Sequence, residues 1–283
     1  MIDAHQHFID FPHPDYAWID ESMQPLRRAA MPDDLEPILR ANGVDGCLAV
    51  QARESLEETR WLLGLAERHD FIRGVVGWVD LAADDLPSTL AELRRQHPHL
   101  VGVRNVVQDK PDPDWLLRPE VLKGLEAIRD AGLTYDLLIR PLHMPSVPRL
   151  AQAVPGLDMV LDHIGKPDIK TGSDPAWQDA IAAIGEVPGV HCKLSGMITE
   201  ADHDGWTADH LEPFVRHTVA CFGYDRLMFG SDWPVCRLAG EYDAMLAGLR
   251  DALGPIEPDD ADRLFDINVR RFYGLESIRN SEP

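Results

Sequence analysis

The sequence predicts a (β/α)8 barrel, or TIM barrel, of the α/β class that occupies residues 1–283 as a single domain. Eight short apolar segments rich in β-branched residues alternate with helical patterns, which is typical of a parallel sheet with helices between its strands. The length of 283 residues, 45% of them hydrophobic, suits a barrel of roughly 250 residues. No Gly-x-Gly-x-x-Gly motif follows an apolar segment, so the sequence does not favour a dinucleotide-binding sheet.

The predicted strands are nearly continuous apolar runs, as expected where helices cover both faces of a parallel sheet. They span residues 2–8, 44–51, 73–81, 101–107, 134–140, 158–165, 190–197 and 227–233. The first helix is predicted to begin at Pro32 and to stop at Asn42 and Gly43. Further helices are predicted at residues 57–69, 86–96, 115–131, 177–184, 208–222 and 242–253, with a terminal helix at 258–272.

Residues 9–31 form an unusually long loop after the first predicted strand. The loop is aromatic, with Phe11, Tyr16 and Trp18. Long loops at the carboxyl ends of barrel strands commonly cover the active site. We therefore expect this segment to be a lid or a wall of the substrate site, with Trp18 as a candidate substrate contact.

The chain is strongly acidic, with 27 Lys and Arg against 48 Asp and Glu and a formal net charge of -21. Such a surface repels phosphate backbones and anionic lipid headgroups, so we expect neither nucleic acid nor a membrane as a partner. The four cysteines form no Cys-x-x-Cys pair, and the sequence contains neither an export signal nor an apolar run of the roughly 18 residues that a membrane span needs. These features predict a cytoplasmic protein and leave its oligomeric state open.

Two histidines, His5 and His7, lie two positions apart on the first predicted strand. Because a strand has a period of two, both side chains should point into the barrel near its catalytic end. His163 ends the sixth predicted strand, and Asp232 ends the eighth. The carboxyl ends of barrel strands converge on one mouth, so we expect all four side chains to meet there. Three imidazoles and a carboxylate predict one divalent metal ion, with zinc as the first choice.

Four ordered motifs surround these residues. They are Ile-Asp-Ala-His-Gln-His-Phe at 2–8, Val-Leu-Asp-His-Ile-Gly-Lys-Pro at 160–167, Lys-Leu-Ser-Gly at 193–196 and Phe-Gly-Ser-Asp-Trp-Pro-Val-Cys at 229–236. Together they resemble the amidohydrolase superfamily, and in particular its branch of sugar lactonases, which includes L-fuconolactonases and L-rhamnonolactonases. Residues 49–54 and 75–80 are also similar to this branch, so the resemblance covers nearly the whole chain.

The resemblance implies hydrolysis of a small sugar-derived lactone, such as L-fuconolactone, to its hydroxy acid. It makes His5, His7 and His163 metal ligands or groups that polarise the carbonyl, and it makes Asp232 the residue that activates water. The branch includes members with and without a functional metal, so the resemblance leaves the need for the ion open. The fourth predicted strand ends in Arg104 and not in a lysine that could be carbamylated to bridge two ions, which argues against a two-metal site.

Further polar residues at predicted strand ends are candidate substrate contacts. Arg104 pairs either with a core carboxylate or, as we prefer, with the carboxylate that ester opening produces. Lys193 has the same possibilities, or it extends to solvent. Gln51 and Arg53 either contact substrate hydroxyl groups or cap a loop. Trp233 is a candidate apolar wall.

The predicted reaction requires no Ser or Cys nucleophile. Asp232 takes a proton from water, which attacks the lactone carbonyl, and then returns a proton to the departing ring oxygen. The histidines, directly or through a bound ion, stabilise the oxyanion. Two other functions stay open. One is a metal-dependent decarboxylase or hydratase of the same superfamily, marked by carbon dioxide release without lactone turnover, and the other is a non-catalytic barrel that binds a sugar acid or a metal.

Overall fold

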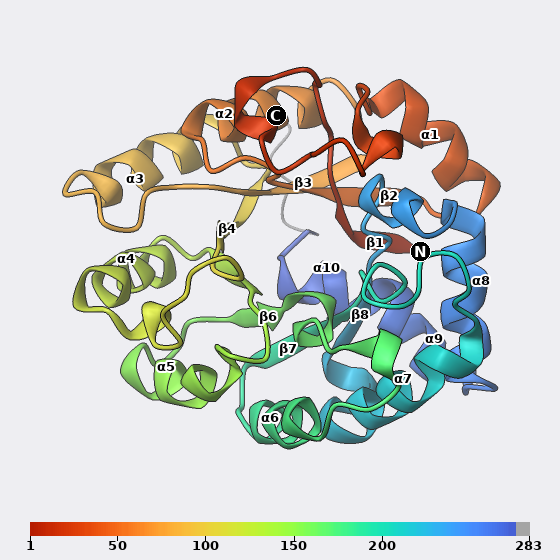
Figure 1. Cartoon of the computed structure of the whole chain (residues 1–283). Helices are drawn as coiled ribbons and strands as arrows, with labels where there is room; N and C mark the ends of the chain where they lie inside the picture. Colours follow the sequence, from red (N-terminus) through yellow and green to blue (C-terminus); the bar gives the residue numbers. More distant parts are fainter. Residues whose placement is uncertain (276–283) are drawn as a thin grey trace.

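The computed structural model describes residues 1–275 and confirms the predicted barrel. Eight parallel strands pair in sequence order, and helices surround them (Figure 1). The strands are β1 (Ile2–Gln6), β2 (Gly46–Val50), β3 (Ile72–Gly77), β4 (Leu100–Val106), β5 (Thr134–Leu138), β6 (Met159–Leu161), β7 (Val190–Leu194) and β8 (Leu227–Phe229). The last eight residues of the predicted domain, 276–283, lie outside the described part of the chain.

Helices connect the successive strands and cover the outside of the barrel (Figure 1). They are α1 (Pro32–Ala41), α2 (Leu56–Ala66), α3 (Leu86–Gln96), α4 (Pro119–Asp130), α5 (Val147–Ala153), α6 (Pro175–Gly185), α7 (Ala208–Phe222), α8 (Tyr242–Leu253), α9 (Pro258–Asp262) and α10 (Asn268–Phe272). Within residues 1–275, no helix combines the length and the apolar character needed to cross a membrane.

Three helices differ from the sequence expectation. The predicted helix at 115–131 divides at Pro119, because proline fits the first turn of a helix and interrupts its interior. The short helix α5 was not predicted, since its seven residues are too few for a clear apolar period. The terminal helix at 258–272 contains a π-helical turn at Arg263–Ile267 between α9 and α10.

Seven of the eight strands are shorter than predicted, and β6 and β8 both end before a predicted site residue. β6 ends at Leu161, because His163 and Ile164 have φ angles of 54° and 48° in the left-handed region, which no strand contains. β8 ends at Phe229, and Asp232 has a φ angle of 58°. His163 and Asp232 therefore lie on turns that follow the strands.

Strand β1 changes the direction of its side chains just before the two histidines. Ile2 and Ala4 belong to an apolar cluster inside the barrel, whose other members are Leu48, Val50, Val76, Val101, Val160, Met228, Val269, Tyr273 and Leu275. Strict alternation would turn His5 away from this interior. The register between β1 and β2 shifts between Asp3 and Gln6, as in a β-bulge, so that His5 and His7 both face inward.

The segment after β8 closes the barrel against β1. The Asp232 backbone N–H donates to the His5 carbonyl oxygen at 2.7 Å. The His7 N–H in turn donates to the Trp233 carbonyl oxygen at 2.6 Å. This seam between the first and the last strand places the Asp232 side chain beside the two histidines.

Candidate active site

A cavity of about 470 Å³ opens at the carboxyl ends of the strands. Its walls come from the long loop after β1 and from the segments at the ends of β2, β4, β5, β6 and β8. The lining residues are His7, Asp15, Trp18, Gln51, Ala52, Arg53, Glu54, Arg104, Val106, Gln108, Asp109, Leu138, His163, Lys166, Asp232 and Val235. Seven of the ten predicted site residues are among them.

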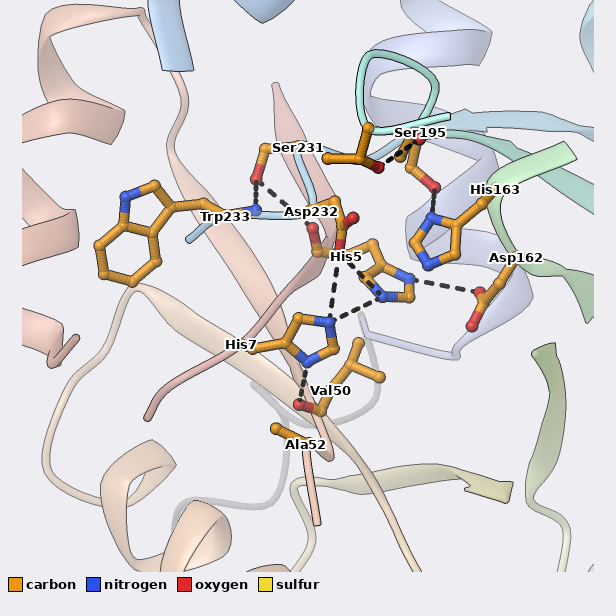
Figure 2. Close-up of polar contacts among 12 residues, drawn as sticks. His5, His7, Val50, Ala52, Asp162, His163, Ser195, Ser231, Asp232 and Trp233 are labelled. Atoms are coloured by element: carbon orange, nitrogen blue, oxygen red, sulfur yellow. Dashed lines mark hydrogen bonds and ion pairs between the residues drawn. The ribbon is translucent and has the colours of Figure 1, made fainter. Parts of the chain in front are cut away.

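The four residues predicted to form the centre lie together (Figure 2). His5 Nε2 and His7 Nε2 are 3.2 Å apart, and Asp232 Oδ1 lies 3.3 Å from His7 Nε2. The rings of His5 and His163 have their centroids 4.4 Å apart. Ligand atoms of His5, His7 and Asp232 lie within 4.8 Å of one another, which suits one metal ion, while His163 groups in the same way with His5 and Asp162.

A backbone carbonyl orients His7. The Nδ1 atom of His7 lies 2.9 Å from the carbonyl oxygen of Val50, which can only accept, so Nδ1 carries the proton. The lone pair of Nε2 therefore faces His5 and Asp232 (Figure 2). A histidine held in this way is a suitable ligand for a divalent ion.

His163 lies on the turn after β6 and is held by the end of β7. Its Nδ1 atom is 2.9 Å from Ser195 Oγ. Gly196 lies directly against the His163 ring, since a Cβ atom at this glycine would be 2.4 Å from Nδ1. The φ angle of Gly196 is +61°, which also favours glycine. The Lys-Leu-Ser-Gly motif thus supports the His163 ring.

Asp232 has a backbone conformation that few non-glycine residues adopt, and its neighbours hold it there. Asp3 Oδ1 accepts from the Ser231 N–H at 2.8 Å, and Ser231 Oγ accepts from the Trp233 N–H at 3.0 Å. The Tyr242 hydroxyl of α8 donates to Asp3 Oδ2 at 3.0 Å. The start of β1 and helix α8 therefore fix the turn that presents the Asp232 carboxylate.

The electrostatics of the centre favour an ionised Asp232 carboxylate and uncharged His5 and His163 rings. Burial alone would raise the pKa of Asp232, but His163 and His7 outweigh burial and hold the pKa below its ordinary value. Burial holds the pKa values of His5 and His163 well below the ordinary histidine value. At neutral pH, Asp232 can therefore accept a proton, and His5 and His163 are uncharged.

A buried charge cluster lies next to His5, away from the cavity. Lys193 Nζ donates to Asp136 Oδ2 at 2.5 Å and forms an ion pair with Asp162 Oδ1 at 3.1 Å. Asp162 Oδ1 is also 3.3 Å from His5 Nδ1. Burial alone would raise the pKa of Asp162, but Lys193, His5 and Arg104 outweigh burial and hold it well below the ordinary value. Two carboxylates and the cations Lys193 and Arg104 balance in charge, as buried ions require.

Arg104 is fully engaged by protein groups. Its Nε and Nη2 donate to Gln51 Oε1 at 3.0 and 2.7 Å, and Nη2 also donates to the Gln51 carbonyl oxygen at 2.5 Å. Nη1 lies 3.1 Å from both Asp162 Oδ2 and His5 Nε2. Gln51 and Asp162 thereby accept from four of the five N–H donors of the guanidinium group. In the structure, Arg104 therefore pairs with a core carboxylate, which is one of the two possibilities from the sequence. A contact between Arg104 and the substrate stays a prediction.

Lys193 and Trp233 are the two candidate substrate contacts that do not line the cavity. The Lys193 side chain is completely buried, so the prediction that it extends to solvent is wrong, and it does not line the cavity. The Trp233 indole packs edge-on against Phe8 and points away from the histidines (Figure 2). The left-handed turn at Asp232 separates the directions of the two neighbouring side chains.

The long loop forms one wall of the cavity, as the sequence predicted. Asp15 and Trp18 line the cavity from this loop. Trp18 Nε1 donates to the Ala52 carbonyl oxygen at 3.1 Å, which joins the loop to the segment after β2. Gln51 and Arg53 lie in that segment and line the cavity beside Trp18.

The sequence analysis missed Asp162, Ser195 and Lys166 as parts of the site. On a continued strand, Asp162 and its neighbour His163 would point to opposite faces, and only the left-handed turn brings both inward. Lys166 lines the cavity and forms an ion pair with Glu200 at 3.0 Å. All three residues lie in the motifs at 160–167 and 193–196, and this was the sequence signal that could have identified them.

Comparisons with known proteins agree with this architecture. The amidohydrolase family model matches residues 2–275. The chain is 40% identical over 281 residues to an L-fucono-1,5-lactonase of Burkholderia ambifaria, which covers 97% of this chain and 96% of that protein. It is 38% identical over 285 residues to an L-fucono-1,5-lactonase of Burkholderia multivorans, with 97% and 96% covered. The crystal structure of an amidohydrolase from Burkholderia multivorans with bound zinc superposes with a TM-score of 0.92 at 34% identity, covering 96% of this chain and 98% of that one. The chain therefore belongs to the amidohydrolase family.

Proposed function

We propose that the chain hydrolyses a sugar-derived lactone, of the kind represented by L-fucono-1,5-lactone, to its hydroxy acid. The observation that carries the proposal is the position of Asp232. Its carboxylate lines the cavity, lies 3.3 Å from His7 Nε2 and is held ionised. The two lactonases that align with nearly the whole chain support the substrate class.

Asp232 is the proposed general base and then the general acid. It takes a proton from a water molecule, whose oxygen forms a bond to the lactone carbonyl carbon. As the bond between that carbon and the ring oxygen breaks, Asp232 returns the proton to the ring oxygen. Ring opening yields a carboxylic acid, which ionises at neutral pH and releases one proton per turnover. No covalent enzyme intermediate is needed.

His163 is the proposed donor to the oxyanion that develops on the carbonyl oxygen. Its ring is uncharged and lines the cavity. If the Ser195 hydroxyl donates to Nδ1 across their 2.9 Å contact, the proton resides on Nε2, which is then a donor. A donor preorganised in this way stabilises negative charge in the transition state more than in the ground state.

The donor set of the centre fits a divalent metal ion, and we propose zinc. His5, His7 and Asp232 would hold it, with His163 beside them, because imidazole nitrogens and a carboxylate oxygen are the ligands that zinc takes in catalytic sites. When bound, zinc would polarise the carbonyl group and lower the pKa of water. Gln51, Arg104 and Trp18 are the proposed neighbours of the substrate. Lys193 would support His5 on the side away from the cavity, and Trp233 would not contact the substrate.

The test is proton release from a panel of five- and six-membered aldonolactones in weak buffer, with the native protein, with Asp232→Asn and after chelation. We expect turnover by the native protein and a loss of about 10³-fold in kcat for Asp232→Asn. Asp202→Asn, on the surface, is the matched control and should keep full activity. Sensitivity to the chelator then decides whether the ion is required. Proton release from none of the lactones would overturn the proposal, and carbon dioxide release from aromatic acids would identify a decarboxylase instead.

A further inference from the structure

Arg53 differs from Arg104 in having hydrogen-bond donors to spare. Its side chain is 3% exposed and lines the cavity. Within the described part of the chain, its guanidinium makes no hydrogen bond, and the buried Nε has an ion-pair neighbour but no hydrogen-bond partner. An unpartnered buried donor is costly, so it calls for a partner that comes from outside the chain. The cavity is where that partner would be.

The position of Arg53 is fixed by its surroundings. The guanidinium carbon lies 5.4 Å from the Tyr16 ring centroid and 6.0 Å from that of Trp61, within the range of cation–π attraction. The Arg53 backbone N–H donates to Glu58 Oε2 at 2.8 Å. The donors are therefore held in place before a ligand arrives, which reduces the entropy lost on binding.

Three carboxylates surround the guanidinium at distances slightly longer than a hydrogen bond. Glu58 Oε1 lies 3.6 Å from Nε, Asp15 Oδ2 lies 3.8 Å from Nη1, and Asp10 Oδ1 lies 3.9 Å from Nη2. Their negative charge compensates the positive charge of Arg53, so the position does not favour an anionic ligand. A neutral group that both accepts and donates hydrogen bonds suits it better.

Hydroxyl groups have this property. Asp15 lines the cavity next to Arg53, and its side chain is 48% exposed, so one of its oxygens can accept from a ligand. A pair of neighbouring hydroxyl groups could accept from the N–H groups of Arg53 and donate to Asp15 at the same time. Trp18, at 39% exposure, offers an apolar surface beside them.

We infer that Arg53 and Asp15 form a specificity-determining subsite that binds two neighbouring hydroxyl groups of the lactone. The inference rests on the proposed function and adds which part of the substrate is recognised and by which residues. Asp15 belongs to the long loop, and Arg53 follows β2, so the subsite is complete only when the loop lies against the β2 end, where Trp18 joins it to Ala52.

The experiment compares an aldonolactone with a set of its deoxy analogues, each lacking one ring hydroxyl. The readout is the ratio of kcat/KM for the parent lactone to kcat/KM for each analogue. In the native protein we expect a ratio of about 30 for at least one analogue, because a hydrogen bond to a charged group contributes on that scale. In Arg53→Met and in Asp15→Asn the same ratio should fall to about 1, mainly through a higher KM for the parent lactone.

Arg27→Met is the matched control. Arg27 also lies in the loop and stacks on an aromatic ring, that of Phe11, but it donates to the Ile19 carbonyl oxygen and does not line the cavity. This variant should keep the native ratio. Arg53→Lys retains the charge and a donor and should keep part of the discrimination, which provides a second test if Arg53→Met folds poorly.

The possible outcomes distinguish a failure of the proposed function from a failure of the subsite. A native protein that opens no lactone removes the proposed function and this inference with it. A native protein that opens the parent lactone but does not discriminate against any deoxy analogue overturns the subsite alone. Equal losses of kcat/KM on the parent and the analogues in Arg53→Met also overturn the subsite, because they would mean that Arg53 only supports the loop.

Discussion

His7 donates the hydrogen on Nδ1 to the carbonyl oxygen of Val50 across 2.9 Å. The bond comes from the last residue of β2, so a strand that contributes no ligand sets the tautomer of a residue at the end of β1. It leaves the lone pair of His7 Nε2 free to bind an ion beside Asp232. The following predictions test this arrangement and its surroundings.

His7→Asn should lower zinc affinity by about 100-fold, because it removes one of the three proposed ligands that approach one another most closely. Equilibrium competition with a chromophoric chelator measures the affinity without reference to activity. His203→Asn replaces a histidine whose Nε2 lies 3.0 Å from the Thr199 carbonyl oxygen at the surface, and it should leave the affinity unchanged. Equal zinc affinity in native protein and His7→Asn would place the ion elsewhere.

The low pKa of Asp232 predicts a flat acid side of the pH profile. Only the ionised carboxylate can take a proton from water, and His163 and His7 outweigh burial to keep it ionised below its ordinary pKa. We expect kcat/KM to change by less than about twofold from about pH 5.5 to about pH 8, after subtraction of spontaneous hydrolysis. An acid limb with its midpoint near neutrality would show that a different group is the base.

Gly196→Ala should damage the site more than the fold. The new Cβ would meet the His163 ring at 2.4 Å, while Gly172→Ala at a similar φ of +76° would meet nothing within 4 Å. Both variants should lose about 1 kcal/mol in urea unfolding, because both place alanine in the left-handed region. Only Gly196→Ala should lose activity, by about tenfold or more, through displacement of His163. Equal activities of the two variants would contradict the proposed role of His163.

Lys193→Met should destabilise the fold by about 3–5 kcal/mol, since it leaves two buried carboxylates without their shared cation. Burial already raises the pKa of Asp136 to about 6 despite Lys193. Adding Asp136→Asn should therefore recover part of the loss in urea unfolding, so that the double variant is more stable than the sum of the single changes. Lys170→Met, at an exposed ion pair with Asp202, should cost less than about 0.5 kcal/mol.

Glu58 predicts a pH dependence of stability. Burial raises its pKa from 4.5 to about 7. A carboxyl with a raised pKa in the folded state stabilises the fold fully below its unfolded pKa, and this contribution is lost as the pH rises through the folded pKa. Glu58→Gln has no such loss, so its Tm relative to native protein should rise by about 5 °C between about pH 4.5 and about pH 8. Glu57→Gln, on the exposed side of α2, should show no such trend.

The fold was predictable because its signals are local and repeated. Eight apolar segments separated by helices define the barrel, and each predicted strand overlaps an observed one. The meeting of His5, His7, His163 and Asp232 followed from the rule that strand ends converge. The orientation of individual side chains depends on departures of the backbone from regular strand geometry, which residue types do not reveal. The bulge in β1 and the left-handed turns at His163 and Asp232 decide which neighbouring side chains face inward.

Those departures account for the residues that were misplaced or missed. Asp162 was missed because strand alternation, with His163 pointing inward, assigns it to the outside. Trp233 was a candidate because it is adjacent to Asp232, although alternation assigns it to the opposite face, where the structure places it. The sequence left Lys193 with a core carboxylate, the substrate or solvent as its surroundings, because the two aspartates that pair with it come from β5 and the end of β6. Pairings between distant strands follow from the register of the closed barrel, and a single sequence does not specify that register.

The seam that joins Asp232 to His5 has a consequence for synthesis. A ribosome makes Asp232 more than 220 residues after His5 and His7, so the nascent protein carries an incomplete centre until β8 and the turn after it emerge. Contacts of such long sequence separation form late in folding, because the ends of the chain must first be brought together. Catalytic competence and closure of the ring are therefore one event, and a polypeptide truncated before the eighth strand would have no base.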